Sequence, residues 1–305
     1  MALSEYLLTV LNRAVTDPKS ALSQIPLELN YYGRRINQHY FSLIGPSMNG
    51  HNLVDEDWDT AIILDACRYD IFNQNCPEEW GVVEKRTAPG SQSREYFQKT
   101  FYDGEYHDTV YITSNPYITD LPEDTFHTIK LDETWEDTAQ QAPPGVVTQE
   151  AKKAHKEYPK KRIIVHYMQP HLPFFGVIGE HVWDKLGWHR GMYYPKDVDV
   201  KEVKKAYTEN LQVVLEHVKD LLVNIDGKII ITSDHGEMLG ERMYPIPVRG
   251  YDHFHSLYLP ELIEVPWVEI ESDNRREIES SPPEGTVQSS SEVQKKRLKA
   301  LGYVE

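Results

Sequence analysis

One short stretch, IIITSDHGE at Ile229–Glu237, joins a run of apolar residues directly to a group of polar ones. A continuous apolar run bounded by polar residues is typical of a strand that is buried on both faces of a parallel sheet. The glycine at position 236 allows the backbone to turn sharply where this strand would end. The stretch therefore predicts an α/β fold, with a carboxylate and an imidazole side by side at the carboxyl end of a core strand.

Similar apolar runs recur along the chain and predict further strands. The predicted strands are Thr60–Leu64, Thr109–Thr113, Arg162–Tyr167, Lys228–Thr232 and Val265–Ile270. Apolar residues also recur at helical spacing between Val200 and Leu222, which predicts an amphipathic helix. Ser93 is expected to begin another helix, and Asp17 followed by Pro18 is typical of a helix start. Strands that alternate with helices predict an α/β sandwich.

The composition divides the chain into three parts. Residues 1–50 are expected to form a helical segment that packs on the core. Residues 51–270 contain the predicted strands and should form the main domain. Residues 271–305 are polar and rich in proline and serine, which predicts a flexible surface segment. A short helix that starts at Ser291 and stops at Gly302 is expected to end the chain.

The composition also restricts location and partners. An apolar stripe at helical spacing near the start of the chain could dock on lipid, but such a stripe more often packs on a core. Its members are Leu3, Leu7, Val10 and Leu11. No stretch approaches the roughly 18 apolar residues of a transmembrane helix, and no secretory signal is recognisable. Two cysteines, Cys67 and Cys76, do not make a disulfide framework. We therefore expect no transmembrane segment and a cytoplasmic location.

The formal net charge of the chain is −16. A nucleic-acid-binding protein needs basic residues that neutralise phosphates, and no basic stripe is visible in the sequence. Nucleic acid is therefore not an expected partner, whereas a small ester is compatible with this composition. The excess of acid is attributed mainly to a strongly solvated surface. Oligomeric state does not follow from any of these features.

Polar residues that directly follow apolar runs are the first candidates for a site, because ligands bind outside the carboxyl ends of strands in open α/β sheets. Asp65 follows the run at Thr60–Leu64, where a structural cap or an ion pair is the alternative role. Asp234 and His235 follow the run in the opening stretch. An aspartate with a histidine suits zinc or manganese.

A hydroxyl group lies between these two motifs in the sequence. The segment RTAPGSQSREY at Arg86–Tyr96 delivers Ser91 and Ser93 to the start of a predicted helix. There the helix dipole favours an alkoxide or an incoming anion, although an ordinary helix cap is the alternative. A serine beside a divalent cation can lose its proton near neutral pH and attack phosphorus or sulfur.

The order of these motifs resembles that of the alkaline phosphatase and sulfatase superfamily. HYMQPHLPF at residues 166–174 looks like the central loop of the superfamily, and YDHFH at 251–255 looks like its late histidine. EVPW at 264–267 and LKALGY at 298–303 resemble its closing strand and the ending of sulfatase-like chains. The resemblance extends from about residue 57 to the last residue. It implies a three-layer sandwich with a mostly parallel central sheet flanked by helices.

The resemblance also implies a metal site. Asp65, Asp234 and His235 would hold one divalent ion, with Ser93 as the nucleophile and the last ligand. Ser93 is preferred to Ser91 as the attacking group, but both remain candidates. Zinc or manganese is the preferred ion, with calcium or magnesium as alternatives.

The implied activity is metal-dependent hydrolysis or transfer of a small-molecule phosphate or sulfate ester through a covalent seryl intermediate. His171 and His253 would steady the ester oxygens or protonate the leaving group. The candidates for binding the anion of the substrate are Arg68, Arg94, Ser91 and His255. His166 is expected to pack in the core.

The chain departs from the superfamily pattern at several points. Neither cysteine lies in the Cys/Ser-x-Pro-Ser-Arg context of the sulfatases that form formylglycine. The central loop lacks the Asp-x-x-x-His pair of the two-zinc enzymes, so one ion is expected, as in the phosphoethanolamine and phosphoglycerol transferase branch. One alternative is a degenerate relative that binds an anion without turnover. Another is a phosphomutase-type branch, which would need a second metal set.

Overall fold

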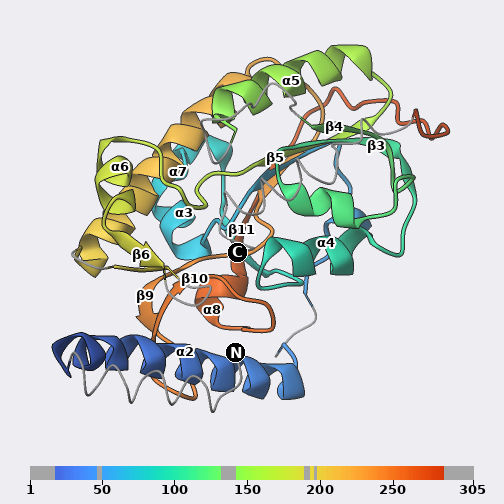
Figure 1. Ribbon diagram of the computed structural model, residues 1–305. Coiled ribbons are helices and arrows are strands. Elements are labelled where there is room, and N and C mark those ends of the chain that lie inside the picture. Colours follow the sequence, from blue (N-terminus) through green and yellow to red (C-terminus); the bar gives the residue numbers. More distant parts are fainter. Residues whose placement is uncertain (1–17, 47–49, 132–141, 189–192, 196–197, 285–305) are drawn as a thin grey trace.

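The computed structural model describes residues 18–46, 50–131, 142–188, 193–195 and 198–284 (Figure 1). A seven-stranded sheet has the order β2-β11-β8-β1-β5-β3-β4. Its strands are β1 (Thr60–Leu64), β2 (Glu84–Thr87), β3 (Tyr106–Thr113), β4 (Phe126–Leu131), β5 (Arg162–Tyr167), β8 (Ile229–Thr232) and β11 (Glu264–Ile270). Strands β8, β1, β5, β3 and β4 are parallel, and β11 is antiparallel to both of its neighbours. The predicted, mostly parallel sheet is therefore confirmed.

Helices cover both faces of this sheet. They are α3 (Tyr69–Asn75), α4 (Ser93–Phe101), α5 (Pro144–Glu157) and α7 (Val200–Leu222). Every residue of β1 is buried, and its side chains alternate between two apolar clusters. Ile62 and Leu64 pack with α5 and α7, whereas Ala61 and Ile63 pack with α4. Figure 1 shows α5 and α7 on one side of the sheet and α4 on the other, which makes three layers.

The apolar runs locate the inner strands better than the outer ones. The predicted bounds of β1, β5 and α7 agree with the structure residue for residue, and β8 is one residue shorter than predicted. The sequence does not predict β2 or β4, the two edge strands. Strand β2 has the sequence Glu-Lys-Arg-Thr, and charged side chains are common on strands that border solvent. Such a strand has no apolar run by which it could be recognised.

Helix α2 lies outside the three layers, beneath β9, β10 and α8 in Figure 1. The elements not yet given are α2 (Pro18–Ile44), α6 (Val177–Trp183), β6 (Leu186–Trp188), β7 (Tyr193–Pro195), β9 (Met238–Arg242), β10 (Arg249–Asp252), α8 (Pro260–Ile263) and the short helices Leu53–Asp55, Glu78–Trp80 and Pro116–Asp120. Helix α2 begins at Pro18, where the sequence predicts a helix start. None of the described helices is both long and apolar enough to cross a bilayer.

The segment 271–284 does not behave as the sequence predicts. It runs along the amino ends of the strands and is tied there by charged groups. Arg275 Nε donates to Asp59 Oδ2 over 2.6 Å, and Lys161 Nζ donates to the carbonyl oxygen of Glu279 over 2.8 Å and to Ser281 Oγ over 2.6 Å. The expectation of a flexible segment is therefore wrong for this part, because its polar side chains neutralise buried charges of the core. The apolar stripe predicted near the start of the chain and the helix predicted from Ser291 lie outside the described residues.

Candidate metal centre and catalytic site

The carboxyl ends of four neighbouring strands bring the polar candidates together. Asp65 follows β1, Asp234 and His235 follow β8, and His166 lies near the end of β5. Asn115 follows β3 and donates from Nδ2 to Asp65 Oδ2 over 2.8 Å. These strands are adjacent and run in the same direction, so groups far apart in sequence meet at one edge of the sheet.

Ser93 supplies a hydroxyl to this edge from the first residue of α4. Its Oγ donates to Asp234 Oδ2 over 2.8 Å, and it lies 3.3 Å from Asp65 Oδ2. The same oxygen lies 3.2 Å from His235 Nε2. All four side chains are buried. The structure thus brings together the three expected metal ligands and the preferred nucleophile.

His166 belongs to the same cluster, although the sequence assigns it to core packing. Its Nδ1 lies 2.9 Å from the hydroxyl oxygen of Tyr111. If that hydroxyl accepts, the proton of the neutral ring is on Nδ1 and the lone pair of Nε2 can bind a metal ion. His166 Nε2 lies 3.7 Å from Asp65 Oδ2 and 3.9 Å from Asp234 Oδ2. The imidazole therefore faces both carboxyl groups.

Burial controls the charges of this cluster. It raises the pKa of Asp65 well above its ordinary value, and the nearby charge of Asp234 adds to the rise. Burial acts in the same direction on Asp234, but His235, His166 and the Ser93 hydroxyl together lower its pKa. Burial also lowers the pKa of His235, and it lowers that of His166 to about 4. Both imidazoles are therefore uncharged near neutral pH, and two carboxyls this close both ionise only beside a positive charge.

The donor set of this cluster fits a divalent ion. Asp65, His166 and Asp234 each offer a ligand atom within 4.8 Å of the others. Asp65 Oδ1 and His166 Nε2 are buried and have no hydrogen-bond partner among the described residues. Carboxylate oxygens and neutral imidazole nitrogens suit zinc or manganese. The cluster therefore has the ligand types and the unpaired acceptor that a metal site needs.

A second cluster adjoins the first. Its members are His171, Glu237, Asp252 and His253, and their ligand atoms lie within 4.8 Å of one another. His253 Nδ1 lies 3.3 Å from Glu237 Oε2 and 3.3 Å from Asp252 Oδ1. The rings of His253 and His235 are 4.3 Å apart between centroids, so the clusters meet there. Burial raises the pKa of Glu237 to about 8 and that of Asp252 to about 7.

The backbone around the ligands is held tightly. Ala66 has a positive φ of 58°, and its N–H donates to Asp234 Oδ1 over 3.1 Å. Cys67 N donates to Ser233 Oγ over 2.8 Å, which links the ends of β1 and β8. A Cβ on Gly236 would lie 2.1 Å from the carbonyl oxygen of Glu261. Position 236 therefore requires glycine because the turn after His235 packs directly against α8.

Ser91 does not lie in the metal cluster. Its Oγ donates to the carbonyl oxygen of Phe254 over 2.8 Å and accepts from the N–H of Leu257 over 3.2 Å. Glu95 Oε2 accepts from the Ser91 N–H over 3.0 Å. Ser91 therefore fastens the segment after β10 to α4, and its role in substrate binding stays a prediction.

The other three anion-binding candidates are also placed elsewhere. Arg68 is buried and forms ion pairs with Asp70 at 2.7 Å and with Glu241 at 2.8 Å, so its charge is already compensated. Arg94 is half exposed and pairs with Asp120 at 2.8 Å. His255 is exposed, and its carbonyl oxygen accepts from Gln38 of α2. Arg68 Nη1 also donates to the backbone carbonyl oxygen of Glu237 over 3.2 Å, so this side chain borders the second cluster. The side chains of Arg94 and His255 make no contact with the two clusters among the residues that the structure describes.

Several residues of the clusters are absent from the sequence prediction. Glu237 and Asp252 stand next to predicted residues, inside the motifs DHGE and YDHFH. Asn115 is the second residue after a predicted strand, so the rule about strand ends could have found it. His166 shares the central loop with His171. The central loop offers no Asp-x-x-x-His pair, and the second cluster uses donors from other positions.

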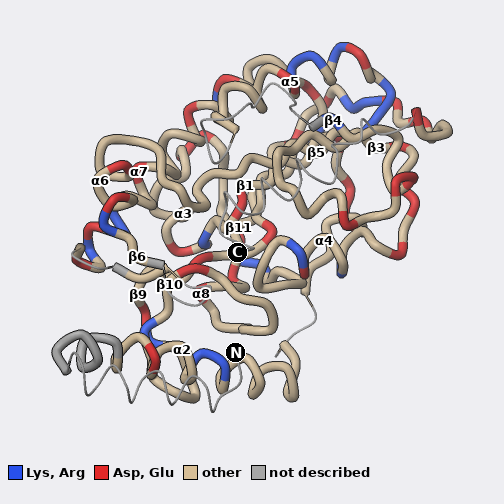
Figure 2. Tube along the Cα trace, in the orientation of Figure 1, with Lys and Arg blue, Asp and Glu red and all other residues tan. Residues whose placement is uncertain are grey.

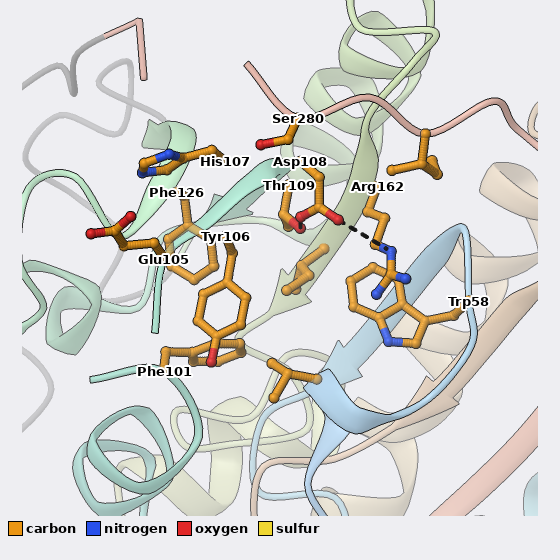
Figure 3. Close-up of a pocket in the computed structure, with 13 residues that line it drawn as sticks. Trp58, Phe101, Glu105, Tyr106, His107, Asp108, Thr109, Phe126, Arg162 and Ser280 are labelled. Atoms are coloured by element: carbon orange, nitrogen blue, oxygen red, sulfur yellow. Dashed lines mark hydrogen bonds and ion pairs between the residues drawn. The ribbon is translucent and has the colours of Figure 1, made fainter. Parts of the chain in front are cut away.

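A separate cavity of about 450 Å³ lies at the opposite, amino-end edge of the sheet (Figure 3). Trp58, Tyr106 and Phe126 form part of its wall. Arg162 lies 5.0 Å from the Trp58 ring centroid and pairs with Asp108 at 3.6 Å. Arg162 and Asp108 therefore compensate each other within the wall of this cavity.

No family model and no curated protein sequence matches the chain. Solved structures match it in fold. The C-terminal periplasmic domain of EcEptC from Escherichia coli, in complex with Zn, is 15% identical with a TM-score of 0.49, over 75% of this chain and 77% of that one. Lipooligosaccharide phosphoethanolamine transferase A (EptA) from Neisseria meningitidis, an integral membrane protein, is 11% identical with a TM-score of 0.47, over 90% of this chain and 64% of that one. A putative sulfatase from Bacteroides thetaiotaomicron is 12% identical with a TM-score of 0.42, over 73% and 66%.

These comparisons contradict one prediction and agree with another. The expected cytoplasmic location is wrong, because the similar domain from E. coli is periplasmic. At such low identity the likeness concerns the fold alone. The chain is similar in fold to phosphoethanolamine transferases and sulfatases, as the resemblance of its motifs to the alkaline phosphatase and sulfatase superfamily predicts.

Proposed function

We propose that this protein is a metal-dependent enzyme that transfers or hydrolyses a phosphate or sulfate ester through a covalent intermediate on Ser93. The observation that carries the proposal is the position of Ser93 Oγ. It lies within 3.3 Å of a carboxylate oxygen of Asp65, a carboxylate oxygen of Asp234 and a ring nitrogen of His235. A hydroxyl in this environment becomes a strong nucleophile when a divalent ion binds its neighbours.

Asp65, Asp234 and His235 would hold the ion, and His166 is a further candidate ligand. When bound, the ion would supply positive charge that favours the serine alkoxide and the anionic oxygens of the ester. The protein contributes a dry, preorganised environment, since all these side chains are buried. Asn115 would orient Asp65 through the hydrogen bond from its amide.

In the first step, Ser93 Oγ attacks the phosphorus or sulfur of the ester. A bond forms between Oγ and that atom while the bond to the leaving oxygen breaks. The hydroxyl proton moves to the carboxylate of Asp234, whose Oδ2 already accepts it over 2.8 Å. The position of Ser93 at the first residue of α4 adds the positive end of the helix dipole near the developing charge.

His171 and His253 would act on the ester and its leaving group. Their rings are 4.9 Å apart between centroids, and His253 stands beside His235. Glu237 and Asp252 hold the Nδ1 side of His253, which fixes the orientation of its ring. Ring N–H groups of these histidines would hydrogen-bond the ester oxygens and deliver a proton to the departing alcohol.

The second step releases the group held by Ser93. Water attacks in a hydrolase and an alcohol attacks in a transferase, and the attacking group gives its proton to the histidine that protonated the leaving group in the first step. The bond to Ser93 breaks, and Oγ recovers the proton that Asp234 took up. Phosphate and sulfate esters both present tetrahedral oxyanions, so the same groups serve either substrate. The proposal therefore covers both classes and both acceptors.

The test is turnover of chromogenic phosphate monoesters, phosphate diesters and sulfate esters by the purified chain with zinc or manganese. Ser93→Ala should lower kcat by about a thousandfold or more, because it removes the nucleophile. Ser91→Ala is the matched control: it removes a buried hydroxyl only two residues away and should change kcat by less than about threefold. Metal analysis by mass spectrometry should find about one ion per chain in the wild type.

Three outcomes would overturn parts of the proposal. A metal-loaded chain that binds phosphate or sulfate but turns over no ester would favour the degenerate anion-binding relative. Equal losses in Ser93→Ala and Ser91→Ala would remove the assignment of the nucleophile. Two ions per chain, with the second lost in His171→Ala, would revive the phosphomutase-type alternative, because the second cluster would then be a metal site.

A further inference from the structure

Helix α2 has an inverted distribution of polar and apolar side chains. The face that packs on the body buries three polar side chains, Arg34, Asn37 and Gln38, beside Phe41. The opposite face carries apolar side chains at intervals of three, four and seven residues. We call it the outer stripe, and its members are Ile25, Leu29, Ile36, Tyr40 and Leu43, which are 49%, 64%, 53%, 40% and 73% exposed. An amphipathic helix of a globular protein normally buries its apolar stripe instead.

The polar face fixes α2 in this orientation. Asn37 Nδ2 donates to the carbonyl oxygen of Ile246 over 2.9 Å, and Asn37 Oδ1 accepts from the N–H of the same residue over 2.8 Å. Gln38 Nε2 donates to the carbonyl oxygen of His255 over 3.0 Å. The Arg34 guanidinium lies 3.9 Å from the ring centroid of Phe254. A rotation of α2 that buried the outer stripe would break these contacts. The polar residues of α2 therefore keep the stripe exposed.

An exposed apolar surface of this length is a site of contact with another apolar phase or partner. A stripe from Ile25 to Leu43 extends about 27 Å along the helix. Its ends and its middle lie on one straight helix, so it offers a line of contact rather than a concave pocket. This shape suits insertion into a planar interface better than capture of a small ligand.

The charges beside the stripe favour an anionic surface. The chain as a whole has a net charge of −16, whereas the sequence of α2 has three basic residues and one acid, Glu28. Arg34 is buried on the opposite face, so Arg35 is the arginine beside the stripe. Arg35 and His39 are exposed next to the stripe. Figure 2 shows a blue stretch on α2, and blue and red stretches alternate on the other elements. An anionic surface would therefore meet a basic residue near the middle of the outer stripe.

We propose that the outer stripe of α2 is a membrane-docking surface that inserts its apolar side chains into an anionic lipid bilayer. The arginine and histidine beside the stripe would meet the headgroups, and Tyr40 would lie at the boundary between headgroups and acyl chains. A second copy of the chain is a poorer occupant. When two such stripes pair symmetrically, the arginines near the middle of each stripe face one another, and both chains are strongly acidic.

The test is sedimentation of the full chain with unilamellar vesicles of equimolar phosphatidylglycerol and phosphatidylcholine, compared with vesicles of phosphatidylcholine alone. The wild type should bind the anionic vesicles more strongly. Leu29→Glu with Ile36→Glu should lower the partition coefficient by about tenfold or more, since it places two charges on the inserted face. Both positions are exposed, so thermal unfolding of the variant should match the wild type.

The matched control is Val82→Glu with Val223→Glu, which adds the same two charges at valines that are 82% and 86% exposed and lie outside α2. This control should bind vesicles nearly as well as the wild type. Equal binding by the stripe variant and the control would overturn the proposal, as would equal binding to the two kinds of vesicle. A wild-type dimer that Leu29→Glu dissociates, without vesicle binding, would assign the stripe to self-association and overturn it as well.

Discussion

The two edges of the central sheet differ in whether a positive side chain compensates their buried carboxylates. At the amino edge, the buried carboxylate of Asp59 accepts hydrogen bonds from Arg275 Nε over 2.6 Å and from the N–H of Lys228 over 2.7 Å. At the carboxyl edge, Asp65 and Asp234 have no arginine or lysine partner among the residues that the structure describes. Both edges bury acids, but Asp59 has an arginine as its partner, whereas Arg68, the buried arginine near the carboxyl edge, pairs with Asp70 and Glu241 instead of Asp65 and Asp234.

This difference distinguishes a structural acid from a binding acid. A buried carboxylate with an arginine is compensated, and it contributes to a fixed arrangement of the chain. A pair of buried carboxylates surrounded by neutral imidazoles lacks positive charge and gains it from an added ion. The amino edge should therefore govern stability, and the carboxyl edge should govern metal binding and turnover.

The largest expected effect is on catalysis. Asp65→Asn should lower kcat/KM by about a thousandfold or more, because it removes a proposed metal ligand next to the nucleophile. The metal-free variant should unfold at the same temperature as the metal-free wild type or higher, since a buried charge is lost. Steady-state kinetics and calorimetry measure the two quantities. If the variant lost stability in proportion to activity, Asp65 would be a structural acid like Asp59 and not a binding acid.

The second effect is stabilisation by metal. Zinc or manganese at about 100 times its Kd should stabilise the wild type by about 2.7 kcal/mol, because the ion binds the folded chain only. Asp234→Asn should abolish most of this gain, whereas Asp59→Asn should retain it. Thermal unfolding with and without the ion measures the difference. Equal gains in the two variants would show that the ion binds outside the proposed cluster.

The third effect is on stability alone. Asp59→Asn should lower the free energy of unfolding by about 2 kcal/mol, because the carboxylate accepts charge-assisted hydrogen bonds from Arg275 at the amino edge. Urea unfolding at neutral pH measures this cost. The kcat of the folded variant should stay within about twofold of the wild type. A large loss of kcat at unchanged stability would contradict the claim that the amino edge governs stability and the carboxyl edge governs turnover.

The smallest expected effect concerns acid stability at the amino edge. Burial, with the nearby Arg276, lowers the pKa of His155 from 6.5 to about 3. The folded chain therefore keeps the ring neutral, whereas the unfolded chain protonates it below pH 6.5. The contribution of the neutral ring to the free energy of unfolding is complete above pH 6.5 and is lost as the pH falls toward 3. The cost should be about 1 kcal/mol between pH 7 and pH 5.5. His155→Gln should unfold with a shallower dependence on pH in this range, and an unchanged slope would show that the ring does not titrate there.

The sequence predicts the centre of the molecule better than its periphery. Buried strands such as β1 and β5 have continuous apolar runs because both faces of the sheet are covered. The residues after these runs are then found by the rule that parallel strands expose their carboxyl ends at one edge. This reasoning places Asp65 and Asp234 together although they are far apart in the chain.

The remaining features depend on contacts that no local pattern encodes. Ser91 and Ser93 have the same side chain and almost the same position, but one faces Phe254 and the other faces Asp234. Arg68 follows a core strand, yet two acids from other positions compensate it. Residues 271–284 have a composition typical of disorder, and their order comes from pairing with groups of the amino edge. Tertiary pairing decides each of these cases.

Gly236 has a practical consequence for engineering. The turn after His235 packs so closely on α8 that a Cβ at this position would lie 2.1 Å from a backbone oxygen. Mutant libraries that aim at new ester specificity can vary the surrounding loops, but they should hold position 236 fixed. Variants with a side chain at position 236 would displace the turn that carries His235. Their loss of activity would then have a steric cause and would say nothing about which esters the site can accept.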